Sequence, residues 1–453
     1  MIITPDSFNS TLLPALVSIQ PTSETEGLPD PLCAMQQRYA LIRLPGGIYV
    51  FDRQALATVT DKGVARKFEP LKRADATLLI IRDITNLFPA SNARQIAKDF
   101  FVHPGTKCFD GIDFNPIKSS DNRQNLWVGP TVVPRDGKPK LIREFLLYVI
   151  CGGNRAYFLY LLGYLAHALQ RPWEKPGIMI ILLSGQGTGK GALAYILNKI
   201  WSATYLHVHQ IKAITGEFNS ALERAFIVWL DEAFFAGNRG ATDSLKSLVT
   251  EPVININEKY QPARQTQSFH RFFGASNAEH YKDTDHDDRR DFVLRVSEDR
   301  KGDFDYWSAL YREIDNGGVE ALVKILLAKD LSKFNVRNKP NTDELTQQKL
   351  KSLEPTAQWW YDCLGCGEID PGMGWPKFVS TNDAIAAVSN ASGQKGGHKP
   401  SALELVQTIK KLCPSADSAQ PLIGKIRKRG LSLPTLKQAR HEFESYMGGP
   451  IKW

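Results

Sequence analysis

The 453-residue chain has only six cysteines, scattered at positions 33, 108, 151, 363, 366 and 413. Cysteines this few and this widely spaced exclude the disulfide framework of a small secreted scaffold. Only Cys363 and Cys366 have the spacing of a zinc-ligand pair, and a tetrahedral site needs two more ligands. No second CxxC or HxxxH follows them in the sequence. Zinc binding and a pair of ordinary thiols therefore both stay open.

The chain also lacks a long apolar run and a strong excess of one charge. Its most apolar segment, Ala156–Ala168, is shorter than the ~20 residues that a bilayer requires, so we expect a buried helix and no membrane partner. The first ten residues show neither the basic nor the apolar part of a secretory signal, which favours the cytoplasm. With 56 Lys and Arg against 48 Asp and Glu, the net charge permits a nucleic-acid partner without requiring one.

The pattern along the chain predicts three regions. Residues 1–140 are expected to be a mixed α/β region of unassigned role, with β-rich runs in Tyr39–Asp52 broken by a Gly-Gly turn. Residues 141–335 open with two helical patterns and continue as alternating strands and helices, which indicates a mostly parallel sheet. A polar stretch at 331–348 is predicted as a linker. Residues 336–453 are expected to be mainly helical and basic, with ten Lys and Arg against four Asp and Glu from residue 399 onward.

A glycine-rich loop is the sharpest signal. Apolar residues Ile178–Leu183 predict a buried strand, and a helical pattern begins at Lys190. Glycines between them let backbone N–H groups converge on phosphates, while the helix N-terminus favours an anion and the lysine reaches the β- and γ-phosphates. The plain structural alternative is a glycine-rich turn. The predicted ATP-binding residues are Gly185, Gln186, Gly187, Thr188, Gly189, Lys190, Gly191 and Ala192.

This loop departs from the common phosphate-binding pattern. Ser184 stands where the pattern begins with glycine, and Gly191 and Ala192 stand where a serine or threonine follows the lysine. The hydroxyl that ordinarily contacts Mg²⁺ is therefore missing from its usual place. Thr188 is the substitute that the loop itself offers.

An apolar segment, Ala225–Leu230, ends in two carboxylates, Asp231 and Glu232. A strand of this kind accompanies phosphate loops, because the first carboxylate can hold Mg²⁺ through water and the second can polarise the attacking water. The alternative is a buried strand whose solvated end is acidic. We predict Asp231 as the metal ligand and Glu232 as the general base.

Two further predicted strands, Val253–Asn257 and Gln265–Phe273, enclose a turn that carries Lys259, Tyr260 and Arg264. Basic side chains beside an aromatic ring suit a single-stranded backbone and a stacked base. A solvated surface hairpin explains the same pattern equally well.

Asn277 ends the next predicted strand, where its amide could orient the hydrolytic water. Arg289 and Arg290 follow an acidic run and precede another strand. A guanidinium offered to a neighbouring subunit's nucleotide would neutralise charge in the transition state. The alternative for either arginine is an ordinary surface network with aspartates. In the first region, Asp110 and Asp113 lack a following histidine motif, so no primase activity is predicted.

The order of loop, acidic strand, hairpin, Asn strand and Arg pair between Gly185 and Arg290 resembles the superfamily 3 helicases. These are AAA+-related hexameric motors of small viruses, phages and mobile elements. The similarity is greatest to the helicase part of phage and plasmid primase-helicases, where a loop of the form GQGTGKG also follows a helical hairpin like Phe145–Gln170. The segment Arg429–Glu444 resembles that family's C-terminal, winged-helix-like region. The resemblance implies an α/β fold with a P-loop, AAA+-like parallel sheet core.

The resemblance also implies an ATP-dependent DNA helicase that works as a homo-hexamer with ATP and Mg²⁺ between subunits. Its partners would be single-stranded DNA, origin or forked duplex DNA and a separate primase, in the cytoplasm of a bacterial host. Two alternatives stay open: an origin-binding initiator that uses ATP for assembly, and a P-loop small-molecule kinase. The implied catalytic and DNA-contacting residues are Lys190, Asp231, Glu232, Asn277, one of Arg289 and Arg290 in trans, and Lys259.

Overall fold

The computed structural model describes residues 30–54, 58–60, 63–65, 68–117, 122–232, 239–259, 263–277, 285–286, 288–392 and 399–453. The fold divides into two compact units. Among the described residues, unit 1 holds those up to 232, 240–277 and 294–340, and unit 2 holds 239, 285–286, 288–293 and 341–453. In this part of the chain no helix is both long and apolar enough to cross a membrane.

Unit 1 begins with a small mixed region in which helices cover a three-stranded sheet of order β2-β1-β5. β1 and β2 pair antiparallel around Gly46 and Gly47, whose φ angles of 97° and 143° require glycine. The prediction of two β-rich runs broken by a Gly-Gly turn is confirmed. The elements are α2 Pro31–Arg38, β1 Tyr39–Leu44, β2 Gly47–Asp52, β3 Thr58–Thr60, β4 Gly63–Ala65, α3 Arg73–Leu87, α4 Ala93–Val102, β5 Cys108–Phe109, β6 Ile112–Asp113 and β7 Gln124–Asn125.

The centre of unit 1 is a five-stranded sheet of order β14-β8-β13-β10-β9. The pairs β8–β13, β13–β10 and β10–β9 are parallel, as the alternating pattern predicted. Every residue of β8 and β13 is buried, which matches the continuous apolar runs of strands covered on both faces. The strands are β8 Met179–Leu183, β9 Tyr205–Val208, β10 Ile227–Asp231, β13 Arg271–Ser276 and β14 Asp291–Arg295.

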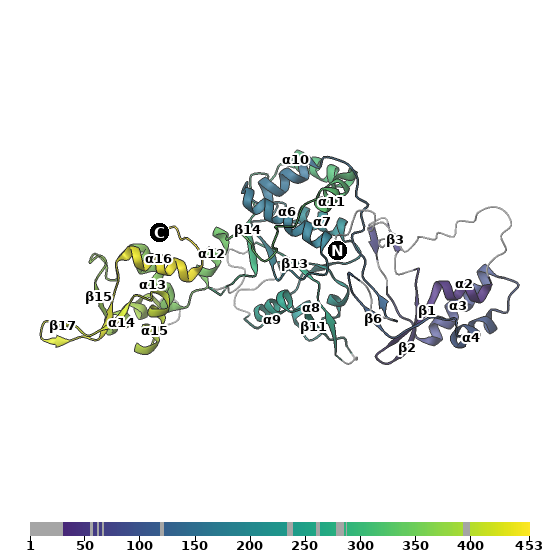
Figure 1. Ribbon diagram of the computed structural model, residues 1–453, viewed down its shortest axis with the longest axis horizontal. Helices are drawn as coiled ribbons and strands as arrows, with labels where there is room; N and C mark the ends of the chain where they lie inside the picture. Colours follow the sequence, from purple (N-terminus) through teal and green to yellow (C-terminus); the bar gives the residue numbers. More distant parts are fainter. Residues whose placement is uncertain are drawn as a thin grey trace. The chain divides into compact units, whose positions relative to one another are not determined.

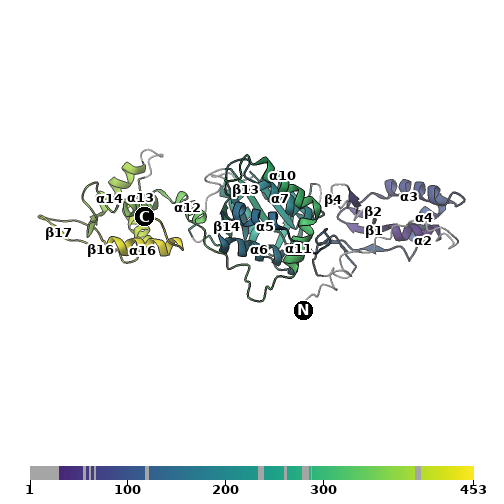
Figure 2. The ribbon, with the colours of Figure 1, turned by 90° about the horizontal axis from the view of Figure 1, so that it is seen from above.

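Helices pack around this sheet, with α6, α7, α10 and α11 grouped on one side and α8 and α9 on the other (Figure 1), and Figure 2 shows the first group from above. The helical hairpin predicted ahead of the loop is present. Asn154 begins its second helix, because the side-chain oxygen of Asn154 accepts hydrogen bonds from the N–H groups of Ala156 and Tyr157. The elements are α5 Lys140–Glu144, the π-helix η2 Phe145–Ile150, α6 Arg155–Gln170, α7 Lys190–Ile200, α8 Lys212–Thr215, the 3₁₀ helix η3 Ser220–Arg224, α9 Arg239–Thr250, α10 Phe304–Glu313, the π-helix η4 Ile314–Gly318 and α11 Val319–Leu327.

Two predicted boundaries are wrong. The predicted strand Gln265–Phe273 is two strands: β12 Arg264–Gln267 pairs antiparallel with β11 Val253–Ile256, and β13 starts afresh at Arg271. Ser268 and His270 separate them, because their buried side chains bond to each other at 2.7 Å and His270 Nε2 contacts Leu222 O at 2.9 Å. The predicted linker at 331–348 is shorter, because Thr342 caps a helix that begins at residue 343.

Unit 2 combines helices with a three-stranded antiparallel sheet of order β15-β19-β16. The aromatic helix predicted around Trp359 and Trp360 is present as α13, and its Trp360 and Leu364 pack with Phe443 in one apolar core. A separate hairpin, β17–β18, carries exposed side chains. The elements are α12 Asp343–Lys351, α13 Pro355–Cys366, β15 Phe378–Ser380, α14 Thr381–Ser392, α15 Ala402–Leu412, β16 Asp417–Ala419, β17 Leu422–Ile423, β18 Ile426–Arg427, β19 Gly430–Ser432 and α16 Leu436–Met447.

Candidate functional site

The glycine-rich loop, residues 184–189, joins the carboxyl end of β8 to the first turn of α7. Gly187 and Gly189 have φ angles of 76° and 104°, which side-chain-bearing residues rarely adopt. A Cβ at Gly189 would also lie 2.4 Å from Trp307 Cη2. Gly189 is the N-cap of α7 and provides no side-chain cap. The first N–H groups of α7 therefore lack the capping oxygen that would compete with an anion.

Lys190 is held at the mouth of this loop. Its Nζ donates to Ser184 O at 2.9 Å, to Gly185 O at 2.8 Å and to Asn277 Oδ1 at 2.7 Å. Burial lowers the pKa of Lys190, and the carboxylates of Glu232, Asp231 and Glu298 act in the opposite direction. The ammonium group thus lies between carbonyl oxygens that a phosphate could replace and carboxylates that keep it charged.

The acidic strand and the Asn strand end side by side, because β10 and β13 are parallel neighbours. Asn277 Nδ2 donates to Glu232 Oε1. Glu232 has a φ of 50°, and its N–H donates to Ala275 O at 2.9 Å. A glutamate in the left-handed region is uncommon, and such backbone strain concentrates at functional sites. The chain therefore turns sharply where its second carboxylate meets the amide of Asn277.

These side chains share one cavity of about 400 Å³, here called the loop cavity. It brings together four residues of the predicted nucleotide site, Lys190, Asp231, Glu232 and Asn277. It also contains two residues that sequence reasoning missed, Trp307 and Tyr311 of α10. Their four-residue spacing was the available signal, but aromatic residues at that spacing on a helix are most often core. The remaining lining residues are Gln186, Gly187, Thr188, Gly189, Gly191 and Ala192.

The donor set of the loop cavity fits Mg²⁺ through Asp231. Carboxylate oxygens, waters and phosphate oxygens are the ligands that this ion prefers. Thr188 is 1% exposed, and its hydroxyl lies 2.5 Å from Ser184 Oγ and 3.2 Å from Gly185 O. This hydroxyl holds the loop together, which argues against its use as the missing metal ligand. Asp231 stays the predicted side-chain ligand for Mg²⁺.

The predicted DNA-contacting residues have different surroundings. Lys259 is exposed beside the turn of the β11–β12 hairpin, and Tyr260 lies outside the described residues. The Arg264 guanidinium donates two hydrogen bonds of 2.7 Å to the Glu223 carboxylate and one of 3.0 Å to the Glu258 carboxylate. The hydrogen bonds with Glu223 raise the pKa of Arg264. Arg264 therefore anchors the hairpin to η3, and its guanidinium is not presented openly to a phosphate backbone.

Arg289 and Arg290 lie in the short segment of unit 2 that leads into β14. Arg289 is exposed and Arg290 is half-buried. Asp288 Oδ1 accepts from the N–H groups of Arg290 at 2.8 Å and Asp291 at 3.1 Å, so this carboxylate shapes the turn. The role of either arginine at a neighbouring subunit's nucleotide stays a prediction.

Cys363 and Cys366 lie on α13, the first buried and the second exposed. Burial raises the pKa of the Cys363 thiol to about 12. Within the described ranges, neither cysteine belongs to a cluster of three His, Cys, Asp or Glu ligand atoms. The ordinary-thiol alternative is therefore favoured over a zinc site.

Known proteins share this sequence and fold in part. Residues 182–290 match a family model described as "Family of unknown function (DUF5906)". The DNA primase-polymerase of Nitratiruptor phage NrS-1 is 27% identical over 247 residues, which cover 51% of this chain and 34% of that protein. The aligned part thus spans about a third of the length of this curated relative.

Solved structures of the NrS-1 C-terminal region have the same fold. One apo structure covers 90% of this chain and 100% of its own, with a TM-score of 0.65 and 15% identity. A second covers 89% of this chain and 100% of its own, with a TM-score of 0.64 and 16% identity. The chain is therefore a mixed α/β protein with a parallel sheet, similar in fold to the C-terminal region of a phage primase-polymerase.

Proposed function

We propose that this protein is an ATP-dependent DNA helicase of a phage or mobile genetic element that acts as a homo-hexameric ring on single-stranded DNA. The observation that carries the proposal is the hydrogen-bonded chain Lys190–Asn277–Glu232 inside the loop cavity. In this chain the Asn277 amide contacts both the Lys190 ammonium group at the glycine-rich loop and the Glu232 carboxylate. This is the arrangement that γ-phosphate cleavage by water needs.

Each residue of the loop cavity has a distinct part in this proposal. Lys190 binds the β- and γ-phosphates, replacing some of its contacts to Ser184 and Gly185. Mg²⁺ held by Asp231 would supply charge neutralisation on the phosphate oxygens. Glu232 accepts the proton of the attacking water, and Asn277 orients that water. Arg289 or Arg290 of the neighbouring subunit stabilises the transition state.

The DNA partner is supported by the position of basic side chains. Lys259 is exposed beside the turn of a hairpin that Arg264 braces through Glu223. In unit 2, the β17–β18 hairpin and the residues after it expose Lys425, Arg427, Lys428 and Arg429. We assign Lys259 to single-stranded DNA and the second hairpin, as the wing of a winged-helix-like region, to origin or forked duplex DNA. The name of the phage relative, a DNA primase-polymerase, supports a place in DNA replication. A separate primase as partner is part of the proposal.

The test is an ATPase assay with and without single-stranded DNA on the full chain, after size-exclusion chromatography. We expect hydrolysis that single strands stimulate, in ring-sized particles. Lys190→Ala should lower hydrolysis by orders of magnitude while circular dichroism shows an intact fold. Normal hydrolysis by folded Lys190→Ala protein would refute the nucleotide site.

The same assay separates the rival functions. Slow turnover without stimulation would favour an origin-binding initiator that uses ATP for assembly, which the exposed basic hairpin also suits. Phosphoryl transfer to a small acceptor in place of water would favour a small-molecule kinase.

A further inference from the structure

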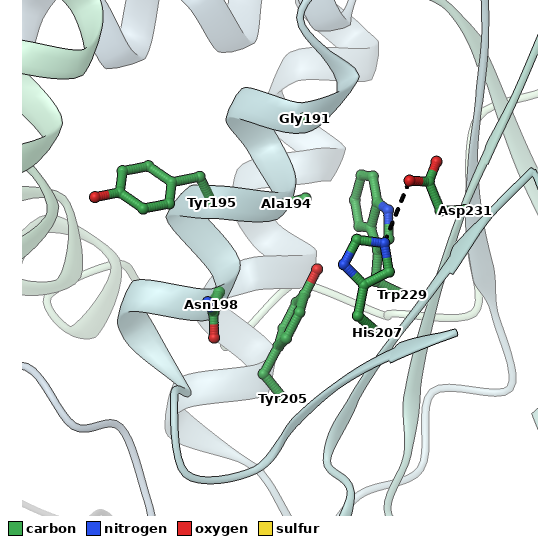
Figure 3. A pocket seen from close by; sticks show the side chains of 8 residues that line it. All are labelled: Gly191, Ala194, Tyr195, Asn198, Tyr205, His207, Trp229 and Asp231. Carbon is green, nitrogen blue, oxygen red and sulfur yellow. Dashed lines mark hydrogen bonds and ion pairs between the residues drawn. The ribbon is translucent and has the colours of Figure 1, made fainter. Parts of the chain in front are cut away.

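A second cavity of about 260 Å³ lies beside the first part of α7 (Figure 3), and we call it the histidine cavity. It shares only Gly191 and Asp231 with the loop cavity. The proposed hydrolysis uses no other residue of it. The additional lining residues are Ala194, Tyr195, Asn198, Tyr205, His207 and Trp229.

Strand geometry brings two imidazoles and a carboxylate together, and His207 and Asp231 of this set line the cavity. Tyr205, His207 and His209 alternate along β9 and just past its end, so their side chains belong to one face of the sheet. His207 is the register partner of Trp229 on β10, and Asp231 is two residues farther along the same strand. The sequence signal is the alternation Tyr-x-His-x-His, which has no obvious use in a phosphate-binding fold.

The three ligand groups are close enough to meet at one ion. His207 Nε2 lies 3.3 Å from Asp231 Oδ2, and the rings of His207 and His209 stack with centroids 4.4 Å apart. One ligand atom from each of the three residues lies within 4.8 Å of the others. A metal ion with bonds of about 2.1 Å holds neighbouring ligand atoms roughly 3 to 4 Å apart. The side chains of His207 and Asp231 are 38% and 39% exposed, so small rotations can close the set.

We propose that His207, His209 and Asp231 bind one divalent transition-metal ion of the Mn²⁺, Co²⁺ or Zn²⁺ class. Imidazole nitrogen suits these ions, whereas Mg²⁺ and Ca²⁺ take oxygen ligands. Among the described residues this is the cluster with three such ligand atoms in reach of one another. Three protein ligands leave coordination positions open for water or substrate.

Tyr205 provides a second, independent pointer to a ligand. Its hydroxyl oxygen is buried and has no hydrogen-bond partner in the described part of the chain. Figure 3 shows this hydroxyl directed into the space between α7 and His207. A buried hydroxyl without a hydrogen-bond partner destabilises the fold. Water on the bound ion would satisfy it.

The site also accounts for the unusual phosphate loop. Gly191, which replaces the ordinary hydroxyl residue, lines both cavities. A metal at Asp231 would therefore have two imidazoles as further ligands beside a loop that lacks the ordinary hydroxyl. This link between the ion and the nucleotide rests on the proposed function, whereas metal binding by the three side chains does not.

The experiment is a titration of the chelator-treated, untagged full chain with Co²⁺ in the absence of nucleotide, followed by visible absorption and calorimetry. We expect one Co²⁺ per chain, displaced by Zn²⁺ and not by an equal concentration of Mg²⁺. His209→Asn and His207→Asn should each weaken Co²⁺ binding by at least about tenfold, since even outer-sphere changes cost that much. His441→Asn, at an exposed histidine of α16, should leave binding unchanged.

Absence of stoichiometric Co²⁺ binding would overturn the site, as would full binding by a folded His207→Asn/His209→Asn protein. Equal competition by Mg²⁺ would also overturn it, because an ion held by two imidazoles should not be displaced by an equal concentration of an ion that prefers oxygen ligands. Lys190→Ala should retain Co²⁺ binding. Co²⁺ binding tests the metal site and ATP hydrolysis tests the nucleotide site. A negative result in one assay therefore leaves the other proposal standing.

Discussion

Asn277 Oδ1 lies 2.7 Å from Lys190 Nζ, so an amide at the end of β13 holds the cation of the glycine loop. β13 is inserted between β8, which leads into that loop, and β10, which ends in the acidic pair. The same amide donates to Glu232. Asn277 therefore joins the lysine side of the loop cavity to its acidic side.

Glu232→Gln should separate nucleotide binding from hydrolysis. Glutamine keeps the size of the side chain and one acceptor oxygen, but it cannot take a proton from water. We expect ATP to bind with near-normal affinity and hydrolysis to collapse, measured by calorimetry and phosphate release. Glu217→Gln, at an exposed glutamate of the same unit, is the matched control. Hydrolysis at the parent rate would place the base elsewhere.

Lys259→Ala should weaken the contact with single-stranded DNA without touching the loop cavity. Loss of one phosphate contact should shallow the log–log salt dependence of binding by about 0.7. Basal ATPase should stay nearly intact, while stimulation by single strands and unwinding decrease. Lys212→Ala, an exposed lysine on α8, serves as control. Unchanged unwinding by Lys259→Ala would favour the solvated-hairpin alternative.

Arg289→Ala/Arg290→Ala should abolish hydrolysis if one arginine acts on the neighbouring subunit's nucleotide. Loss of such a group costs roughly 10³-fold or more, whereas a surface ion pair is worth under about 1 kcal/mol and nothing catalytically. Mixed with Lys190→Ala protein, the double variant should regain part of the activity, because some interfaces then pair an intact lysine with an intact arginine. Full activity of the double variant alone would exclude the role in trans.

Unit 1 should lose stability as the pH falls from about 6.5 to about 4. Burial lowers the pKa of His167 to about 4 and that of His270 to about 3. The unfolded chain takes up these protons at about pH 6.5 while the folded chain does not, so each histidine lowers the free energy of unfolding by up to about 1.4 kcal/mol per pH unit in that window. Above the window this penalty is absent.

Urea unfolding at several pH values measures this slope. His441→Asn should keep it, because that histidine is exposed. A free energy of unfolding that stays constant from about pH 6.5 to about pH 4 would contradict the assignment of two neutral, buried imidazoles.

The site residues that lie at the ends of strands were predictable from the sequence. Asp231 and Asn277 each follow an apolar run, and parallel strands present their carboxyl ends at one edge. The hairpin at Gly46 and Gly47 was predictable because its geometry is local. Trp307 and Tyr311 were missed, since only tertiary packing carries α10 to the loop cavity.

Arg264 shows a different limit of sequence reasoning. A basic residue beside a turn suits DNA, but its partner Glu223 lies forty-one residues earlier and no periodicity links the two. The break between β12 and β13 was hidden for a similar reason. In the sequence, Ser268 and His270 fit a continuous strand. The contact between the His270 ring and Leu222 O, which ends the strand, depends on tertiary packing.

The bracing of the β11–β12 hairpin limits how the proposed helicase could move DNA. Asn219 bonds to Asn255 O at 2.9 Å and accepts from Asn257 N–H at 2.8 Å, and Arg264 adds its ion pairs on the same side. At the far end of the connected segment, buried Arg271 donates to Arg171 O at 3.2 Å. These contacts fasten the hairpin close to its turn, so it cannot swing independently of the rest of unit 1. Under the proposed function, a power stroke would therefore have to be a rigid-body rotation of the whole ATPase body, driven at the interface between subunits.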